Sequence, residues 1–324
     1  MSDYKQLFQE QSTTWKLATD NYRALSKVIF KEYIIDGFRV RLQFNPGRII
    51  SSSANVSKDA ITERPCFLCA KNRPVEQTFL TFEDVENTVL ANEFQILVNP
   101  FPVFPQHFTI AAKEHQPQAI EGQMDTILRL AKCMDDCVVF YNGPRCGASA
   151  PDHLHFQAGS KGLMPIESDY EDWKKEHLSI LTTEKEVQVY QLEGLLRNGW
   201  LMEGKNEKEL IKSFDLLLKS LETVNTSFGE EPMLNFLCWY KKDHWTCVLF
   251  PRKKHRPDCY FRDNETKLLI SPAAVEMGGL MIAARQEDFE RITEDEIRDI
   301  YNEVSISKVE ADLISRKFTD HLNA

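Results

Sequence analysis

Residues 142–157 read NGPRCGASAPDHLHFQ and carry the strongest structural signal in this chain. In a strand, side chains two residues apart point to the same face, so we expect His153, His155 and Gln157 to line one face. Leu154 and Phe156 then pack on the other face. Because three polar side chains on one face of a buried strand are costly unless they bind something, the pattern predicts a functional strand. The alternative, an ordinary surface strand with two histidines, leaves the residues before it unexplained.

A turn of small residues comes directly before this strand. Gly143 and Gly147 would let backbone N–H groups approach a phosphate closely. The Arg145 guanidinium and the Ser149 hydroxyl would add a charge and a hydrogen-bond donor. We therefore predict that these four residues bind a phosphate group of the substrate.

The expected chemistry is attack of a histidine on phosphorus. A neutral imidazole is a good nucleophile at pH 7, and a covalent histidine–nucleotide intermediate would split one displacement into two. The other ring nitrogen must be held by an acceptor, usually a backbone carbonyl, so that the attacking nitrogen keeps its lone pair. Gln157 offers an amide donor for a phosphate oxygen, but it is no proton shuttle and would not activate water.

Working outward from this stretch, the sequence predicts a mixed α+β fold. Asp36-Gly37 between apolar runs is typical of a hairpin, and residues 51–60 read as a loop. Apolar periodicity places helices over 120–138 and 206–221. Thr293 and Glu296 form a capping box at the start of a further helix. The remaining predicted strands are 94–98, 108–112, 137–141, 234–240 and 246–250.

A sequence pattern that occurs twice suggests two copies of one structural unit. FTIAAKEHQP at 108–117 and CVLFPRKKHRP at 247–257 are both an apolar strand followed by Lys-X-His-X-Pro. EMGGL at 276–280 is expected to be the second copy's strand without histidines. We predict an N-terminal helical segment over 1–30, a catalytic half over 31–195 and a degenerate half over 196–324.

Composition excludes several partners. The chain has 324 residues with Lys+Arg 39 and Asp+Glu 49, so its net charge is 39 − 49 = −10. An acidic protein is a poor general binder of nucleic acid or anionic membranes. No run reaches the roughly 18–20 apolar residues of a membrane helix, and no signal peptide is visible. With eight cysteines at low density, we predict a reduced cytoplasmic location.

The motif resembles that of a known superfamily. His-φ-His-φ-Gln after Gly-X-Ser-X-Pro looks like the transferase branch of the histidine-triad (HIT) superfamily, which includes galactose-1-phosphate uridylyltransferase and diadenosine tetraphosphate phosphorylase. HLHFQA at 153–158 and the segments 271–297 and 303–307 are most similar to GDP-hexose (GDP-L-galactose) phosphorylase. PVFPQHFTIAAKEHQPQ at 102–118 resembles the phosphorylases' strand that enters the nucleotide site. The resemblance spans roughly residues 32–307.

The resemblance implies a fold and a set of roles. The fold would be HIT-like antiparallel sheet units with flanking helices, the second half being a degenerate repeat. His155 would be the nucleophile and Gln157 would bind the α-phosphate, whereas His153 would be structural or a metal ligand. His107 would lie near the nucleotide, and Asn142 would contact the substrate beside the small-residue turn. Asp152 departs from the pattern of the uridylyltransferase and the diadenosine phosphorylase, in which His follows the Pro directly.

Cys66-X-X-Cys69 is the candidate metal site. Two ligands alone are a weak zinc signal, because closed sites use four. The segment resembles the knuckle of galactose-1-phosphate uridylyltransferase, which implies that His115 and His153 complete a Cys₂His₂ set around a structural zinc, with no organic cofactor. The alternatives are two free thiols, a redox pair, or a metal site that also takes His155.

A basic run, Lys253-Lys254-His255-Arg256, has two interpretations. It could contact a phosphate across a repeat or subunit interface. A solvated face is the preferred interpretation.

The function expected from these observations is nucleotidyl transfer through a nucleotidyl-histidine. The favoured reaction converts GDP-hexose and phosphate to hexose 1-phosphate and GDP. Diadenosine polyphosphate phosphorolysis, uridylyl exchange between hexose 1-phosphates, and a non-catalytic nucleotide binder stay as alternatives. The partners would be a nucleotide-sugar or dinucleoside polyphosphate and inorganic phosphate, and the resemblance to the uridylyltransferase implies a homodimer.

Overall fold

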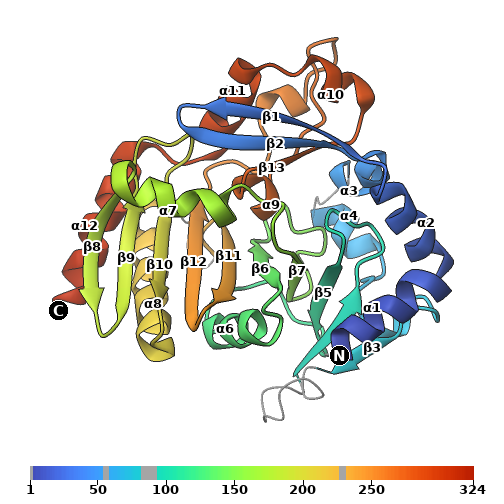
Figure 1. Ribbon diagram of the computed structural model, residues 1–324, viewed down its shortest axis with the longest axis horizontal. Helices are drawn as coiled ribbons and strands as arrows, with labels where there is room; N and C mark the ends of the chain where they lie inside the picture. The colour runs from blue at the N-terminus through green and yellow to red at the C-terminus, as the bar shows by residue number, and fades with distance from the viewer. Residues whose placement is uncertain (1–2, 54–57, 82–92, 226–230) are drawn as a thin grey trace.

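The structure is a computed structural model that describes residues 3–53, 58–81, 93–225 and 231–324. Within these ranges the strands form two sheets, one of ten strands and one of three (Figure 1). Every neighbouring pair in the large sheet is antiparallel. From edge to edge its order is β3 (Phe79–Thr81), β4 (Phe94–Val98), β5 (His107–Ala112), β7 (His155–Ser160), β6 (Cys137–Asn142), β11 (Leu234–Lys241), β12 (His244–Pro251), β10 (Trp200–Gly204), β9 (Val187–Leu192) and β8 (Leu178–Glu184).

The two halves of the large sheet have the same topology. Counted from each edge inward, the strands of each half come in the chain order first, second, third, fifth, fourth. A helix stands between the third and fourth strands of each half: α6 (Met124–Cys133) and α8 (Glu207–Asn225). The halves join through the antiparallel pair β6 and β11. The second half is therefore a repeat of the first, and β12 occupies the position that β7 has in the first half.

The small sheet and the remaining helices cover the two faces. β1 (Ile29–Ile35) and β2 (Phe38–Phe44) form a hairpin, and β13 (Leu280–Ala283) pairs with β2 in parallel. Asp36 and Gly37 turn the hairpin with φ of 51° and 76°, the positive values that such a two-residue turn requires. The other helices are α1 (Asp3–Thr14), α2 (Lys16–Leu25), α3 (Ile49–Ser52), α4 (Lys58–Glu63), α7 (Ile166–Glu176), α9 (Ala274–Met277), α10 (Gln286–Arg291), α11 (Glu294–Val304) and α12 (Lys308–Leu322).

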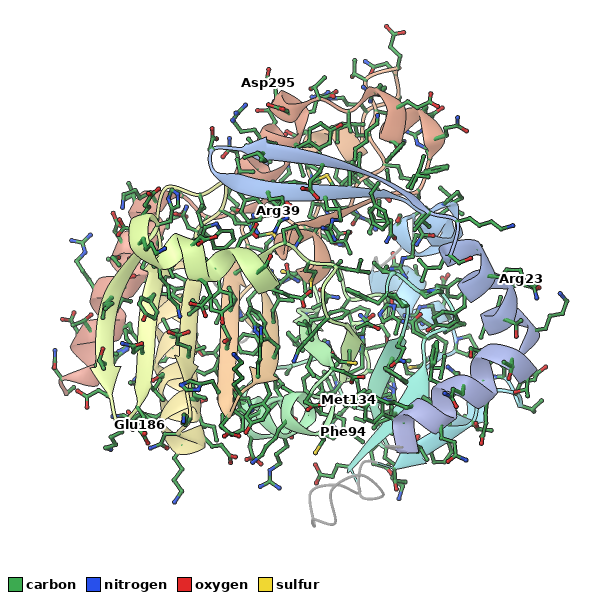
Figure 2. All side chains as sticks on the ribbon, viewed as in Figure 1. Arg23, Arg39, Phe94, Met134, Glu186 and Asp295 are labelled. Carbon is green, nitrogen blue, oxygen red and sulfur yellow. The ribbon has the colours of Figure 1, made fainter. Side chains whose placement is uncertain are left out.

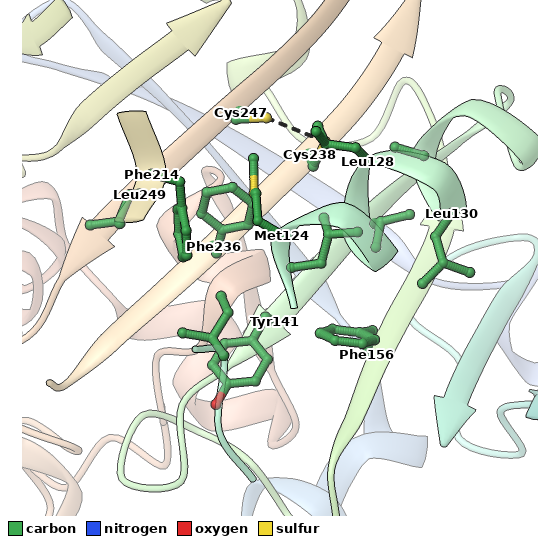
Figure 3. Close-up of a cluster of buried hydrophobic side chains, with 14 of the residues drawn as sticks. Met124, Leu128, Leu130, Tyr141, Phe156, Phe214, Phe236, Cys238, Cys247 and Leu249 are labelled. Carbon is green, nitrogen blue, oxygen red and sulfur yellow. Dashed lines mark hydrogen bonds between the residues drawn. The ribbon is translucent and has the colours of Figure 1, made fainter. Parts of the chain in front are cut away.

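Two apolar cores lie on opposite faces of the large sheet. One packs α1, α6, α8 and α12 on the sheet, and Figure 3 shows part of it, where Phe214 of α8 and Phe236 of β11 meet edge to face with centroids 5.1 Å apart. The other core fills the space between the large sheet, the small sheet, α7, α9 and α11. Charged and apolar side chains differ in exposure as expected from these cores. Arg23 and Asp295 lie on the outside of the protein (Figure 2), whereas Phe94 is only 2% exposed.

Most predicted elements are present. The hairpin, the strands at 94–98, 108–112, 137–141, 234–240 and 246–250, and both predicted helices are confirmed, with ends shifted by a few residues. Thr293 accepts a hydrogen bond from Glu296 N, which confirms the capping box. Among the described residues no helix is both long and apolar enough to cross a bilayer. The domain boundaries proposed from the sequence stay a prediction.

Three predictions about local structure are wrong. Residues 51–60 are not simply a loop, because α3 and α4 occupy much of this stretch, while 54–57 lie outside the described residues. EMGGL is not the second copy's strand, since Glu276 belongs to α9 and β13 joins the small sheet. The repeated sequence pattern matched β5 with β12, but the strand that is topologically equivalent to β12 is β7. A short sequence match cannot reveal which strand lies beside which, because that order depends on long-range pairing.

The core around β11 can be tested by one truncation. Phe236 is fully buried against Phe214, so Phe236→Ala should lower the free energy of unfolding by about 3–5 kcal/mol. Urea denaturation followed by circular dichroism measures this loss. Ile180→Ala serves as the control, because Ile180 is 59% exposed. Equal effects of the two substitutions would contradict the packing described here.

Candidate active site

A cavity of about 560 Å³ lies on the face of the large sheet that carries His155 and Gln157. Its walls come from both halves of the chain and from the N-terminal helices. The first half supplies β4, β5 and β7 and the turn before β7, while Trp15 directly precedes α2 and Leu17 lies in its first turn. Residues 255–282 of the second half supply the opposite wall.

His155 is held as a neutral imidazole in one tautomer. Its Nδ1 lies 2.8 Å from the carbonyl oxygen of His153. Because a carbonyl only accepts, Nδ1 is the protonated nitrogen and Nε2 keeps its lone pair. Nε2 makes no hydrogen bond to any described residue, and His155 lines the cavity. Burial lowers the pKa of His155 to about 4, so the ring is neutral at pH 7.

Gln118 positions the backbone around His155, and the sequence patterns did not single it out. Its Oε1 accepts from His155 N at 2.8 Å. Its Nε2 donates to the carbonyl oxygens of His155 and Asn142 at 3.0 and 2.9 Å. This one buried amide therefore ties β7 to the end of β6. Its position in KEHQPQ, three residues after His115 and directly after Pro117, gave no signal, because nothing local distinguishes it from a loop glutamine.

His107 orients the amide of Gln157. Its Nδ1 accepts from Val103 N at 3.2 Å, so Nε2 carries the proton and donates to Gln157 Oε1 at 3.0 Å. Burial, with a contribution from Arg48, lowers the pKa of His107 to about 3. The Gln157 carbonyl oxygen is thereby engaged, and its NH₂ group is left to donate to a substrate oxygen. His107 lines the cavity as expected, but both of its ring nitrogens are used within the protein.

The predicted phosphate-binding residues separate into two groups. Asn142, Gly147 and Ser149 line the cavity. Asn142 Oδ1 accepts from Ala274 N at 2.8 Å, which leaves its NH₂ group as the donor. Gly147 has φ of +100°, and a Cβ there would lie 2.5 Å from Ala273 Cβ, so only glycine fits.

Gly143 and Arg145 do not line the cavity. A Cβ at Gly143 would lie 2.9 Å from the Leu234 carbonyl oxygen, and Arg145 donates to the carbonyl oxygen of Glu231 at 3.2 Å. The structure thus gives these two residues a packing position behind the turn. The spacing in the sequence could not show this, because β11 approaches the turn from the other half of the chain.

Cys66, Cys69, His115 and His153 form one cluster. The four donor atoms lie within 4.8 Å of one another. Cys66 Sγ is 3.4 Å and Cys69 Sγ is 3.6 Å from His153 Nδ1, and Cys69 Sγ is 3.3 Å from His115 Nδ1. A tetrahedral zinc with ordinary bond lengths would separate sulfur and nitrogen ligands by about 3.6 Å. The residues present therefore fit a thiophilic metal ion.

The His153 ring is already oriented for this site. Its Nε2 donates to the Ala112 carbonyl oxygen at 2.8 Å, so Nδ1 presents its lone pair to the cysteines. The expected strand face of His153, His155 and Gln157 is wrong in one respect. β7 begins only at His155, and His153 precedes it in a bend that directs its ring toward the cysteines. The His153 ring therefore faces the two cysteines, whereas His155 lines the cavity.

The cavity is more cationic than the protein around it. Among the residues that the structure describes, its lining includes Arg48, Arg64 and Arg256 but only one carboxylate, Glu276, in a chain with a net charge of −10. Burial raises the pKa of Glu276 to about 7, which weakens that negative charge further. A cavity with this balance favours an anionic ligand with several charges.

Half of the basic run belongs to this cavity. Lys253 is exposed, and Lys254 forms ion pairs with Asp258 and Glu303. His255 and Arg256 instead line the cavity. The preferred interpretation of the whole run as a solvated face is therefore wrong for its last two residues, because the chain turns inward after Lys254.

Comparisons with known proteins agree with this architecture. Residues 7–160 match a domain of unknown function (DUF4922), and residues 172–323 match the GDPGP1-like C-terminal domain. The search of curated proteins found no match.

Solved structures of a yeast enzyme share the fold. The crystal structure of yeast Ap4A phosphorylase Apa2 has a TM-score of 0.57 and 18% identity, covering 90% of this chain and 94% of that chain. The Apa2 complex with Ap4A has a TM-score of 0.59 and 18% identity, covering 90% of this chain and 96% of that chain. The Apa2 complex with AMP has a TM-score of 0.57 and 18% identity, covering 90% of this chain and 95% of that chain.

The fold is thus shared with yeast Ap4A phosphorylase Apa2, and the C-terminal half of the chain carries the GDPGP1-like C-terminal domain. Both findings agree with the histidine-triad superfamily recognised from the motif.

The metal cluster gives a direct prediction. We expect the purified protein to contain about one zinc per chain, and Cys69→Ser to lose the metal and melt at a lower temperature. Elemental analysis by mass spectrometry and a thermal melt measure both. Cys133→Ser is the matched control, because Cys133 on α6 lies outside the cluster. His155→Ala should keep its metal, and loss of the metal in that variant would make His155 a ligand.

Proposed function

We propose that this protein is an NDP-hexose phosphorylase, with a GDP-linked hexose as the favoured substrate, that works through a nucleotidyl group on His155. The observation that carries the proposal is the hydrogen bond of His155 Nδ1 to the His153 carbonyl oxygen. It leaves an unprotonated Nε2 on the wall of a cationic cavity, beside an amide that donates to anions. A nucleophile, an oxyanion donor and a multiply charged pocket together suit attack on a nucleotide.

In the first step, Nε2 of His155 attacks the α-phosphorus. The bond to the bridging oxygen breaks, and its electron pair leaves with hexose 1-phosphate. In the second step, an oxygen of inorganic phosphate attacks the same phosphorus. The P–N bond breaks, its electrons return to Nε2, and the nucleoside diphosphate is released. The Nδ1 proton stays on the ring throughout, where the His153 carbonyl stabilises the transient positive charge.

The surrounding residues have supporting roles in this proposal. The NH₂ groups of Gln157 and Asn142 would donate to non-bridging oxygens of the α-phosphate, and Ser149 would add a hydroxyl. A zinc ion held by the Cys₂His₂ cluster would act structurally, because it would fix His153 and with it the carbonyl that orients His155. Gln157 supports phosphate over water as the acceptor, because a glutamine takes no proton from water.

The choice of substrate rests on resemblance. The similarity of 153–158, 271–297 and 303–307 to GDP-hexose phosphorylase favours a GDP-linked hexose, and the GDPGP1-like domain supports it. The shared fold with yeast Ap4A phosphorylase Apa2 supports dinucleoside polyphosphate phosphorolysis as the second candidate. Uridylyl exchange and a non-catalytic nucleotide binder stay as alternatives. A homodimer and a cytoplasmic location are further proposals, the latter supported by eight free cysteines.

A phosphate-dependence assay tests the reaction. GDP-, UDP- and ADP-hexoses and diadenosine tetraphosphate are incubated with the protein, with and without inorganic phosphate, and the nucleotides are separated by ion exchange. We expect nucleoside diphosphate only with phosphate, fastest from a GDP-hexose. His155→Ala should lose at least about 10³-fold in kcat, because no other nucleophile replaces the imidazole. Nucleoside monophosphate formed without phosphate would make the protein a hydrolase instead.

The covalent intermediate can be trapped. When phosphate is omitted, substrate labelled in the α-phosphate should label the wild-type protein, because the second step lacks its acceptor. The label should be acid-labile and alkali-stable, as expected for a P–N bond, and peptide mapping should locate it on His155. His177→Ala is the control, since His177 lies outside the cavity. Labelling that persists in His155→Ala would contradict the assigned nucleophile.

A further inference from the structure

The catalytic cavity contains a basic pair from the half that has no histidine motif. His255 and Arg256 follow β12 and line the same cavity as His155. Neither ring nitrogen of His255 hydrogen-bonds to any residue that the structure describes. Nothing in the roles assigned above to Gln157, Asn142 and Ser149 uses either residue.

A buried network holds this pair in place. Arg252 is fully buried, and its Nη2 donates to the carbonyl oxygens of Lys254 and His255 at 3.1 and 3.0 Å. Its Nη1 donates to Asn235 Oδ1 at 2.6 Å. Asn235 Nδ2 in turn donates to Asn142 Oδ1 at 2.9 Å. The basic pair is therefore connected through two side chains to Asn142, which lines the cavity beside His155.

The Arg256 guanidinium is itself oriented. Its Nε donates to Ser271 Oγ at 3.0 Å, and its centre lies 4.2 Å from the Tyr260 ring centroid. Ser271 is two residues from Ala273, against which Gly147 of the small-residue turn packs. Because two residues span at most about 7 Å, Arg256 is anchored one short segment away from the proposed α-phosphate site.

We propose that His255 and Arg256 form the subsite for the phosphate group on the far side of the scissile bond. This inference rests on the proposed function. In an in-line displacement the attacking phosphate enters where the leaving phosphate departed. One subsite therefore binds the β-phosphate of the substrate in the first step and inorganic phosphate in the second. Arg256 supplies a positive charge, and His255 supplies a hydrogen bond.

The test separates the two steps. A nucleoside 5′-phosphorimidazolide has a leaving group without phosphate, so His155 can be nucleotidylated without using the subsite. Inorganic phosphate then discharges the nucleotidyl-enzyme, and rapid quench follows both rates. For Arg256→Ala we expect nucleotidylation within about 3-fold of wild type, while discharge by phosphate slows roughly 10- to 100-fold through loss of charge-assisted hydrogen bonds. Arg256→Lys should recover part of that loss.

Lys253→Ala is the matched control, because Lys253 belongs to the same basic run but is exposed. It should leave both rates unchanged. Discharge of Arg256→Ala at the wild-type rate, or equal slowing of both steps, would overturn the subsite. A wild-type protein that forms no adduct with the imidazolide would overturn the proposed function, and the subsite with it. Thermal melts of each variant establish that it is folded.

Discussion

The site depends on one hydrogen bond, from His155 Nδ1 to the carbonyl oxygen of His153. This hydrogen bond determines that Nδ1 carries the proton, and it orients the ring so that Nε2 keeps its lone pair. That carbonyl is fixed in turn because the His153 ring donates to the Ala112 carbonyl and its other nitrogen meets the two cysteines. His153 thus joins the Cys66–Cys69 turn, the last residue of β5 and the start of β7. A metal in this cluster would fix His153, whose carbonyl oxygen orients His155, without lying in the cavity.

The two halves of the sheet share a topology but not a chemistry. On β12, the counterpart of β7, Val248 and Phe250 belong to the apolar core under the small sheet. The face that borders the cavity in the first half is therefore filled and covered in the second. The second half reaches the cavity through residues 255–282, which follow β12. This explains how a repeat without the His-X-His motif still lines the same cavity.

Buried polar groups connect the halves across the β6–β11 pair. Asn142 and Asn235 are directly opposite in that register, and Arg252 extends the connection to the second half. An unpaired buried polar group is costly, so other orientations of these side chains are disfavoured. Each member holds its neighbour in one orientation, so the amide of Asn142 presents its NH₂ group to the cavity.

The sequence by itself determined the local elements. The Asp36-Gly37 turn, the capping box at Thr293 and the apolar strands are all set by short-range preferences, and those predictions are confirmed as structure. The roles of His155 and Gln157 stay a prediction, and of the three polar residues of the motif these two lie on β7. The identity of the Cys₂His₂ set followed from resemblance, and the four residues do meet. Tertiary structure alone decided that His153 turns away from His155, that the counterpart of β12 is β7 and not β5, and that Gln118 and Arg256 belong to the site. These features depend on where strands pair and which loops return to a shared cavity. Such contacts join residues far apart in the chain, and no local preference encodes them.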